Sequence, residues 1–345
     1  MQDEVMGKPN MLKQVNLSMI RKAILEKGTA TRAEIVAATN IGVSTVRTLL
    51  TELQQAGELA PVGLDESTGG RSATRYELNK ERFFGVSLCL DGERVRYLTM
   101  NICGEIRESG LFAAENDAGA AICRFLDALW DKMEIRSIGI GVPGIVKGMG
   151  YERKNLQGEL EYFPIGEVIH NRYGVPVVLE NDLNAIALGF GRRYLKSYPK
   201  ERCENVNMAY LHFDNDCLSA GFLSNGKILR GWNNFVGELG LFPMENNQTL
   251  DDVLASPIDD AAYARLVARL IAGICCILNP KYVALGGTAF RKDAMPLITE
   301  CFNGTLPSNM SPEILYADDK WHDYFEGMAY LTARHIFTDV RLVKE

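Results

Sequence analysis

Three helical patterns open the chain, and turn-forming residues separate them. The first ends near Gly28, and its apolar positions have helical spacing: Leu17, Ile20, Ala23 and Ile24. The second begins at Thr31 and Glu34, which stand at the spacing of a capping box, where each side chain bonds the other residue's backbone amide. The third follows a turn at Gly42, for which we expect a positive φ, and Ser44 is expected to cap it. Its apolar face is formed by Val46, Leu49, Leu50 and Leu53.

Two short helices joined by a tight glycine-containing turn are the helix-turn-helix arrangement, whose second helix places its N-terminal residues in the major groove of DNA. The exposed positions of that helix are therefore predicted to bind a double-stranded DNA operator: Ser44, Thr45, Arg47 and Thr48. The Arg47 guanidinium can pair with guanine, and the hydroxyl groups suit phosphates or base edges. For Arg47 alone, a solvated helix face is the alternative.

Two strand patterns follow, at residues 59–62 and 74–78, and a polar loop from Asp65 to Ser72 joins them. Such a pair is the wing of a winged helix-turn-helix. Its tip reads Gly69-Gly70-Arg71, so the backbone can approach the duplex and Arg71 can enter a minor groove or grip a phosphate. The alternative is a three-helix protein-interaction module that binds no DNA.

From Phe83 the pattern changes to strands with few helices between them. Strands are predicted at residues 83–90, 95–100, 105–112, 137–144 and 175–179, with a helix from about 118 to 132. A second β-rich stretch covers 206–229, and long helices near 260–278 and 322–337 flank a strand at 282–285. Two such halves predict a two-lobed α/β body with a cleft between the lobes. The expected domains are residues 1–80 and 81–345, the latter with a first lobe of about 81–190, a second of about 191–320 and a C-terminal helix at 321–338.

Composition restricts the compartment and the chemistry. The chain has no run of about 18 apolar residues, and its polar N-terminus lacks an apolar signal core, so we expect a cytoplasmic protein that does not enter a membrane. Its 8 cysteines lie mostly in apolar runs without CxxC spacing, which indicates reduced, buried thiols and no metal site. The net charge is −7, yet residues 1–80 hold 10 Lys and Arg against 9 Asp and Glu, and the remainder 27 against 35. That asymmetry fits a small DNA-reading module on an acidic body.

Four motifs follow one another along the body, and their order and spacing are more specific than any one of them alone. They are GIGVPG at 139–144, ENDLNA at 180–185, GELG at 237–240, and Gly286-Gly287 at the end of a strand. With the preceding winged helix, they make the chain resemble the ROK family from about residue 12 to residue 337. That family contains repressors and sugar kinases, and the resemblance implies an actin-like ATPase fold for the body. Family members are typically dimers or tetramers, so a homodimer or homotetramer is expected.

By that resemblance, four side chains are expected to bind a sugar-like effector in the cleft: Asn155, Asn181, Asp182 and Glu238. Amides and carboxylates suit sugar hydroxyls, which both donate and accept hydrogen bonds. In the family's kinases the aspartate also acts as general base. Each residue has a plainer alternative, because Asn181 or Asp182 can cap the following helix, and Glu238 can be a solvated carboxylate or form an internal salt bridge.

Two phosphate loops of the family are altered in this chain. The first reads DxGGT in the family, and residues 87–91 read SLCLD here. The second reads GTGxG, and the stretch from Asn215 to Ser219 replaces it with the acidic Asp216 inside. A phosphate cradle needs converging backbone amides, so we expect no ATP cofactor and no kinase activity. Leu241 replaces the family's histidine and no CxCGxxGC follows, so no zinc is expected, and the effector need not be an ordinary hexose.

The sequence therefore predicts a DNA-binding transcription regulator, of the repressor type, for genes of carbohydrate metabolism. This regulator is expected to respond to a sugar or sugar-derived effector and not to be an enzyme. Effector binding would shift the closure of the lobes through its different affinity for the two states. Two rival hypotheses remain. One is a constitutive DNA-binding protein whose body only oligomerises, and the other is an active sugar kinase. Polar residues retained in the cleft argue against the first, and the missing glycines argue against the second.

Overall fold

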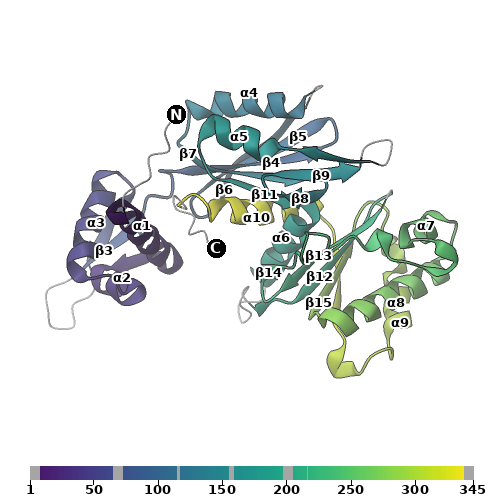
Figure 1. The fold of residues 1–345 in the computed structure, drawn as a ribbon. Helices are drawn as coiled ribbons and strands as arrows, with labels where there is room; N and C mark the ends of the chain where they lie inside the picture. The colour runs from purple at the N-terminus through teal and green to yellow at the C-terminus, as the bar shows by residue number, and fades with distance from the viewer. Residues whose placement is uncertain are drawn as a thin grey trace.

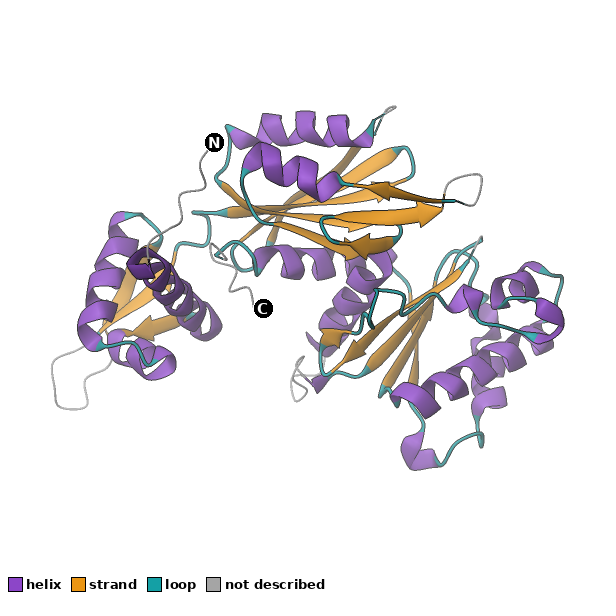
Figure 2. Cartoon of the chain, in the orientation of Figure 1, coloured by secondary structure: helices purple, strands orange, loops and turns teal. Residues whose placement is uncertain are grey.

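The computed structural model describes residues 8–64, 73–114, 117–154, 159–196, 205–215 and 217–337. A small helical domain at the N-terminus is followed by two lobes, each built on a five-stranded sheet (Figure 1). The predicted fold class, an N-terminal helix-turn-helix followed by a two-lobed α/β body, is confirmed. Helices cover the faces of both sheets (Figure 2).

The N-terminal domain packs its helices around one apolar core. Its elements are α1 (Lys8–Lys27), β1 (Thr29–Thr31), α2 (Arg32–Thr39), α3 (Val43–Gln55), β2 (Leu59–Leu64) and β3 (Thr74–Leu78), and the strands are ordered β1-β3-β2. The apolar positions predicted from helical spacing are buried, among them Ile20, Leu50 and Leu53. The capping box is present, because the Thr31 amide donates to Glu34 Oε2 at 2.7 Å and the Glu34 amide donates to Thr31 Oγ1 at 3.3 Å.

The turn between α2 and α3 differs from the sequence-based expectation. The residue with a positive φ is Asn40, at 56°, whose amide donates to the Val36 carbonyl and ends α2. Gly42 has φ −58° and is the N-cap of α3, with no side-chain cap, so Ser44 lies inside the first turn. Asparagine tolerates the left-handed conformation, so the glycine is not needed for it. The prediction that Ser44 caps α3 was therefore wrong, whereas its predicted exposure is confirmed.

The first lobe orders its sheet as β11-β7-β4-β5-β6. Strands β4, β7 and β11 run parallel, so their carboxyl ends meet at one edge. Helices α4 and α5 cover one face of this sheet, and α10 lies below the other (Figure 1). Its elements are β4 (Phe84–Asp91), β5 (Arg94–Asn101), β6 (Ile106–Ala113), α4 (Ala118–Trp130), β7 (Ile135–Val142), β8 (Ile145–Lys147), β9 (Gly150–Lys154), β10 (Leu160–Phe163), α5 (Ile165–Tyr173) and β11 (Val177–Asn181).

The second lobe orders its sheet as β14-β13-β12-β15-β16, with β12, β15 and β16 parallel. Helices α8 and α9 bury their apolar faces on one side of this sheet, and α6 packs on the other. The strands are β12 (Met208–Phe213), β13 (Leu218–Ser224), β14 (Lys227–Ile228), β15 (Tyr282–Gly286) and β16 (Glu313–Ala317). The helices are α6 (Asp182–Lys196), α7 (Leu250–Ala255), α8 (Asp260–Leu278), α9 (Met295–Phe302) and α10 (Lys320–Ala333), with short 3-10 helices η2 (Leu239–Leu241), η3 (Glu245–Asn247), η4 (Lys292–Ala294) and η5 (Ser308–Met310).

Helices α6 and α10 cross between the lobes at two glycines. A Cβ on Gly189 would lie 1.6 Å from the Asp323 carbonyl oxygen, and a Cβ on Gly327 would lie 2.0 Å from that of Ala185. No side chain fits there, so the two backbones can approach closely only with glycine at both positions. Because α10 also packs on the first-lobe sheet and α6 on the second, this crossing joins the two lobes.

The end of the chain's last helical segment reaches back to the N-terminal domain. Ile336 is buried in the same apolar core as Leu17 and Leu53, and Phe83 and Ile102 of the body join it. The Phe337 ring meets the Phe83 ring edge-on, with centroids 6.2 Å apart. The N-terminal domain is thus packed directly on residues that follow α10.

Two expectations drawn from composition need comment. Cys89 and Cys275 are buried, but Cys103, Cys217 and Cys276 are exposed, so the prediction of buried thiols was wrong for these three. Helix α8 is long and apolar enough to cross a membrane by length and composition alone, and it was not recognised in the sequence as such a segment. Seven of its side chains are buried, and they belong to the core of the second lobe, as in the core helix of a globular domain.

Candidate functional site

The predicted DNA-contacting residues lie on one exposed surface at the start of α3. Ser44, Thr45, Arg47 and Thr48 are all exposed, while Val46 and Leu49 point into the core. The Thr48 hydroxyl donates to the Ser44 carbonyl oxygen at 3.1 Å, which leaves its oxygen free to accept a further bond. No hydrogen bond or ion pair with another described residue engages the Arg47 guanidinium. It is therefore available to a ligand that approaches this surface.

Arg75 on the wing strand β3, which the sequence predicts only as part of a strand, bonds the wing to the helix-turn-helix. Arg75 on β3 donates to Glu34 Oε1 at 3.0 Å and to Thr29 Oγ1 at 3.1 Å. The amide of Thr31 and the guanidinium of Arg75 lower the pKa of Glu34, so this carboxylate stays ionised at neutral pH. These bonds hold the wing against α2. The predicted wing residue Arg71 lies outside the described residues.

Arg32 is a further exposed cation of the N-terminal domain that was not predicted as a contact. It is the first residue of α2 and is exposed. In helix-turn-helix proteins the first helix of the pair crosses the DNA backbone. Its position at the start of a helix, next to the capping threonine, was the available signal in the sequence.

Asn181 stands at the carboxyl end of β11 and is already used by the fold. Its side-chain amide donates to the Gly144 carbonyl oxygen at 3.1 Å, and its carbonyl oxygen accepts from the Asn184 amide at 3.2 Å. The second bond is that of a helix cap on α6, so the plainer explanation for this residue accounts for part of its chemistry. One N–H and one lone pair remain, and binding of an effector by Asn181 stays a prediction.

Asp182 belongs to a charged cluster that contains residues from both sides of the lobe junction. Burial raises the pKa of Asp182 to about 6, against the bond from the Leu183 amide and the charge of Lys320. The ammonium of Lys320 lies 3.8 Å from Asp214 Oδ2. Asp214 also meets the His212 ring nitrogen at 3.2 Å. Asp214 and Lys320 were not predicted, because neither stands in a motif and only the fold brings them to Asp182.

The loop that leads to Glu238 is clamped against the first lobe. Arg230 pairs with the buried carboxylate of Glu180, and the Asn234 side-chain amide donates to the Val146 carbonyl oxygen at 2.8 Å. Glu238 ends this loop at the start of η2, near enough to Cys217 that its negative charge contributes to the raised pKa of that thiol. Asn155 lies outside the described residues. Of the four expected effector residues, the structure thus describes three.

Two backbone amides at the second phosphate loop already have partners within the fold. The Asp214 amide donates to the Cys217 carbonyl oxygen at 3.0 Å, and the Leu218 amide donates to Asp251 Oδ1 at 2.7 Å. The Asp214 carboxylate accepts from the Thr288 hydroxyl and amide, and although burial raises its pKa, these bonds outweigh that effect and lower it. An ionised Asp214 carboxylate and the loss of these two amides as donors disfavour a bound triphosphate. Asp216 itself lies outside the described residues.

The residues present do not fit the family's zinc. Leu241, at the position of the family's histidine, is an exposed side chain that offers no ligand atom. Among the described residues, no three His, Cys, Asp or Glu side chains are grouped so that they could hold a metal ion.

Comparison with known proteins finds similarity to one protein family over part of the chain. Residues 114–252 match the ROK family. The xylose repressor of Caldicellulosiruptor bescii is 27% identical over 252 residues, which cover 68% of this chain and 60% of the repressor. The DNA-binding transcriptional dual regulator NagC of Escherichia coli is 23% identical over 251 residues, 69% of this chain and 60% of NagC. The aligned part of the chain thus spans about three fifths of these relatives' length.

Solved structures share the fold at low sequence identity. A ROK family transcriptional regulator, a homologue of the E. coli MLC protein, superposes with a TM-score of 0.72 at 17% identity, over 95% of this chain and 98% of that one. The ROK hexokinase from Thermus thermophilus superposes with a TM-score of 0.56 at 18% identity, over 72% of this chain and 97% of the hexokinase. The regulator covers nearly the whole chain, including the N-terminal domain, whereas the hexokinase covers less of it.

Proposed function

This chain carries a ROK-family domain over residues 114–252, and from that premise we propose that the protein is a sugar-responsive DNA-binding transcription regulator without kinase activity. The N-terminal domain binds a double-stranded operator through α3. A sugar or sugar derivative binds at the lobe junction near Asp182 and Glu238. Its binding changes the arrangement of the lobes, and so the placing of paired DNA-binding domains. The relatives named as xylose and N-acetylglucosamine repressors support a carbohydrate effector.

The observation that carries the proposal is the combination of two surfaces in one chain. One is an exposed helix face with an uncommitted arginine, Arg47, on a helix-turn-helix domain. The other is a polar junction between lobes, where Asp182 is half-buried and its pKa is raised. Groups with perturbed pKa values are concentrated at binding and catalytic sites. The altered phosphate loops distinguish this combination of surfaces from the nucleotide site of an active kinase.

The DNA half of the proposal is tested by Arg47→Ala. We expect this variant to lose on the order of tenfold in affinity for duplexes selected from a random library, because one bidentate arginine–guanine pair contributes about 1–3 kcal/mol to discrimination. Specificity should relax at one base pair rather than uniformly. The measurement is a fluorescence-anisotropy titration of the purified full chain at fixed salt.

Lys22→Ala is the charge-matched control. Lys22 is exposed on α1 and pairs with Glu26 one turn along the same helix. If both variants lose the same modest affinity at every sequence, Arg47 acts only through charge and the base contact is wrong. If neither binds less tightly than the wild type, α3 is not the DNA-reading helix.

The effector half is tested by thermal denaturation with a panel of sugars, sugar phosphates and Mg·ATP. A ligand that binds only the folded state must raise the melting temperature, by an amount set by its concentration relative to Kd. We expect a shift with one class of sugar, none with Mg·ATP, and loss of the sugar shift in Asp182→Ala. A clear Mg·ATP shift would favour the kinase hypothesis. If no compound in the panel raises the melting temperature, the result would favour a body that only oligomerises.

We also infer that the regulator acts in the cytoplasm as a homodimer or homotetramer. One winged helix offers a single half-site, and two-fold paired domains read two half-sites about one or more DNA turns apart. The operator is therefore expected to be roughly palindromic. Sedimentation of the full chain, alone and with selected duplex, gives the stoichiometry.

A further inference from the structure

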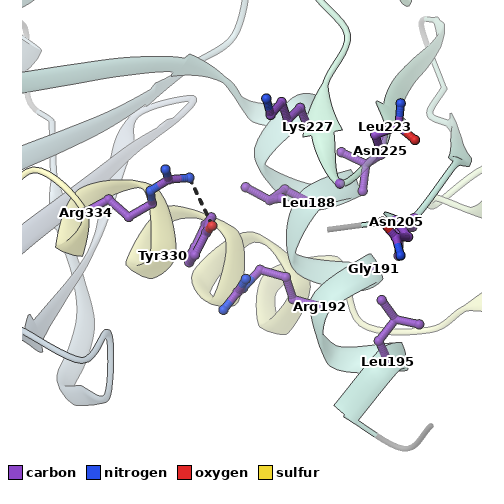
Figure 3. Close-up of a pocket in the computed structure, with 12 residues that line it drawn as sticks. Leu188, Gly191, Arg192, Leu195, Asn205, Leu223, Asn225, Lys227, Tyr330 and Arg334 are labelled. Carbon is purple, nitrogen blue, oxygen red and sulfur yellow. Dashed lines mark hydrogen bonds between the residues drawn. The ribbon is translucent and has the colours of Figure 1, made fainter. Parts of the chain in front are cut away.

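A pocket lies beside the crossing of α6 and α10, and none of the residues proposed to bind the sugar lines it. Its volume is about 510 Å3, and it is bounded by those two helices and by the hairpin of β13 and β14. Figure 3 shows Arg192 from α6, Tyr330 from α10 and Arg334 just beyond it, with Lys227 on the hairpin above them. Pockets of 300–1,000 Å3 are the size that small-molecule ligands occupy.

The pocket is cationic although the protein is acidic. Its charged lining residues are Arg192, Lys227 and Arg334, and no Asp or Glu from the described stretches lines it. The whole chain has a net charge of −7. A positive concavity on a negative body concentrates anions locally.

Two of these cations are held close together by one aromatic ring. The Arg192 guanidinium carbon lies 3.6 Å from the centre of the Tyr330 ring, and that of Arg334 lies 5.2 Å from it. Arg334 also donates to the Tyr330 hydroxyl at 3.0 Å. Placing two like charges on one ring costs free energy, and an anion that accepts hydrogen bonds from both would remove this cost.

The other two cations of α6, Arg193 and Lys196, form ion pairs, unlike Arg192. Arg193 bonds Asp323 at 2.8 Å and Lys196 bonds Glu326 at 2.7 Å. In contrast, neither Arg192 nor Lys227 forms an ion pair with any acidic residue that the structure describes. The cations of α6 that face acidic side chains of α10 therefore form ion pairs, whereas Arg192, which lines the pocket, does not.

We propose that this pocket binds a small phosphate-bearing anion between Arg192, Lys227 and Arg334. Planar guanidinium groups match phosphate oxygens in a bidentate manner, and a lysine adds a point charge. The side chains of Asn205 and Asn225 at the rim supply polar groups for the rest of such a molecule. The ligand class is a phosphorylated metabolite or inorganic phosphate.

The position of Arg334 gives the pocket a route to the DNA-binding domain. Arg334 lies two residues before Ile336, which is buried in the core of that domain, and three before Phe337, which lies 5.1 Å below the Arg21 guanidinium of α1. An anion that fixes Arg334 therefore acts on the segment that seats the domain. The site is separate from Asp182, so its occupancy can be sensed independently of the sugar.

The test uses the full chain and isothermal titration with inorganic phosphate, glucose 6-phosphate and glucose, at ionic strength matched with sodium chloride. We expect both phosphate-bearing probes to bind in the pocket. Any binding of glucose should be unaffected by substitutions in the pocket. Lys227→Gln should weaken phosphate binding by on the order of tenfold, the effect of losing one charge-assisted bond. Arg192→Gln should do the same, and Lys227 is the safer variant because it stands exposed on the hairpin.

Lys196→Gln is the matched control, since it removes the same charge from α6 outside the pocket. Tighter binding of glucose 6-phosphate than of phosphate supports a phosphorylated metabolite, and equal binding supports the free anion. The proposal is overturned if Lys196→Gln and Lys227→Gln lose affinity equally, or if binding is lost in Asp182→Ala and kept in Lys227→Gln. It is also overturned if Lys227→Gln weakens DNA binding without added anion and reduces its salt dependence, because the pocket then holds a DNA phosphate.

Discussion

Replacing Arg21 by alanine is expected to destabilise the N-terminal domain by about 3–5 kcal/mol, because it leaves a buried carboxylate without its partner. Arg21 of α1 makes two bonds to Glu58, from Nε at 2.8 Å and from Nη2 at 3.0 Å. Both side chains are only 9% exposed. Glu58 stands at the junction between α3 and β2, so this ion pair fixes α1 against α3 and the wing. The Arg21 guanidinium also covers the Phe337 ring.

The measurement is native-state hydrogen exchange of amides in α1 and α3, which reports the opening free energy of this domain rather than of the whole chain. Lys22→Ala, at the next position but 74% exposed, is expected to change little. The double variant Arg21→Met with Glu58→Leu should recover much of the loss, since apolar residues can replace a buried ion pair without penalty. A loss below about 1 kcal/mol in Arg21→Ala, the range of surface pairs, would show that water reaches the pair.

Asp182→Asn is expected to stabilise the protein at pH 7.5, on the order of 3 kcal/mol, and to change its stability little near pH 4. Burial raises the pKa of this carboxyl from 3.8 to about 6 in the folded state. Between these two values the folded state binds more protons than the unfolded state, so stability falls as pH rises and stays lower above pH 6. Asparagine does not titrate, and it can still accept the bond that the Leu183 amide donates to Asp182.

Urea unfolding of both proteins at pH 4 and pH 7.5 gives the two differences. The opposing effects at this position are the positive charge of Lys320, which favours the ionised form, and the negative charge of Asp214, which disfavours it. No gain at pH 7.5, or an equal gain at both pH values, would mean that the ionised carboxylate carries no cost in the fold. An aspartate retained at such a cost is typical of a binding site, where sugar hydroxyls would donate to it.

The elements could be predicted from sequence wherever local pattern decides them. Helical spacing correctly placed Val46, Leu49 and Leu50 in the core and left Arg47 exposed. The turn before α3 was harder, because both an asparagine and a glycine tolerate a positive φ. The structure uses Asn40 for the end of α2, which frees Gly42 to be an ordinary N-cap. Residue propensity indicates which residues can adopt a positive φ. Where each helix ends determines which of them adopts it.

Of the candidate effector site, only the residues that stand in a recognisable motif could be predicted from the sequence. Asn181 and Asp182 stand in a recognisable motif, yet their neighbours come from distant parts of the chain. Glu180 meets Arg230, which lies 50 residues away in sequence, and Arg21 meets Glu58 at a separation of 37. Such pairs depend on how whole elements pack, and no spacing in the sequence encodes them. The plainer role of Asn181 as a helix cap, by contrast, was visible in the sequence and is confirmed.

The most direct measurement is the affinity of the full chain for a selected duplex, with and without the sugar that raises its melting temperature, in the wild type and in Asp182→Ala. We expect the sugar to change the wild-type affinity and to leave that of Asp182→Ala unchanged, while both proteins bind the duplex equally without sugar. A binding constant that is the same with and without every stabilising sugar would contradict a sugar-responsive regulator. So would a sugar response that survives intact in Asp182→Ala, because the effector would then bind elsewhere.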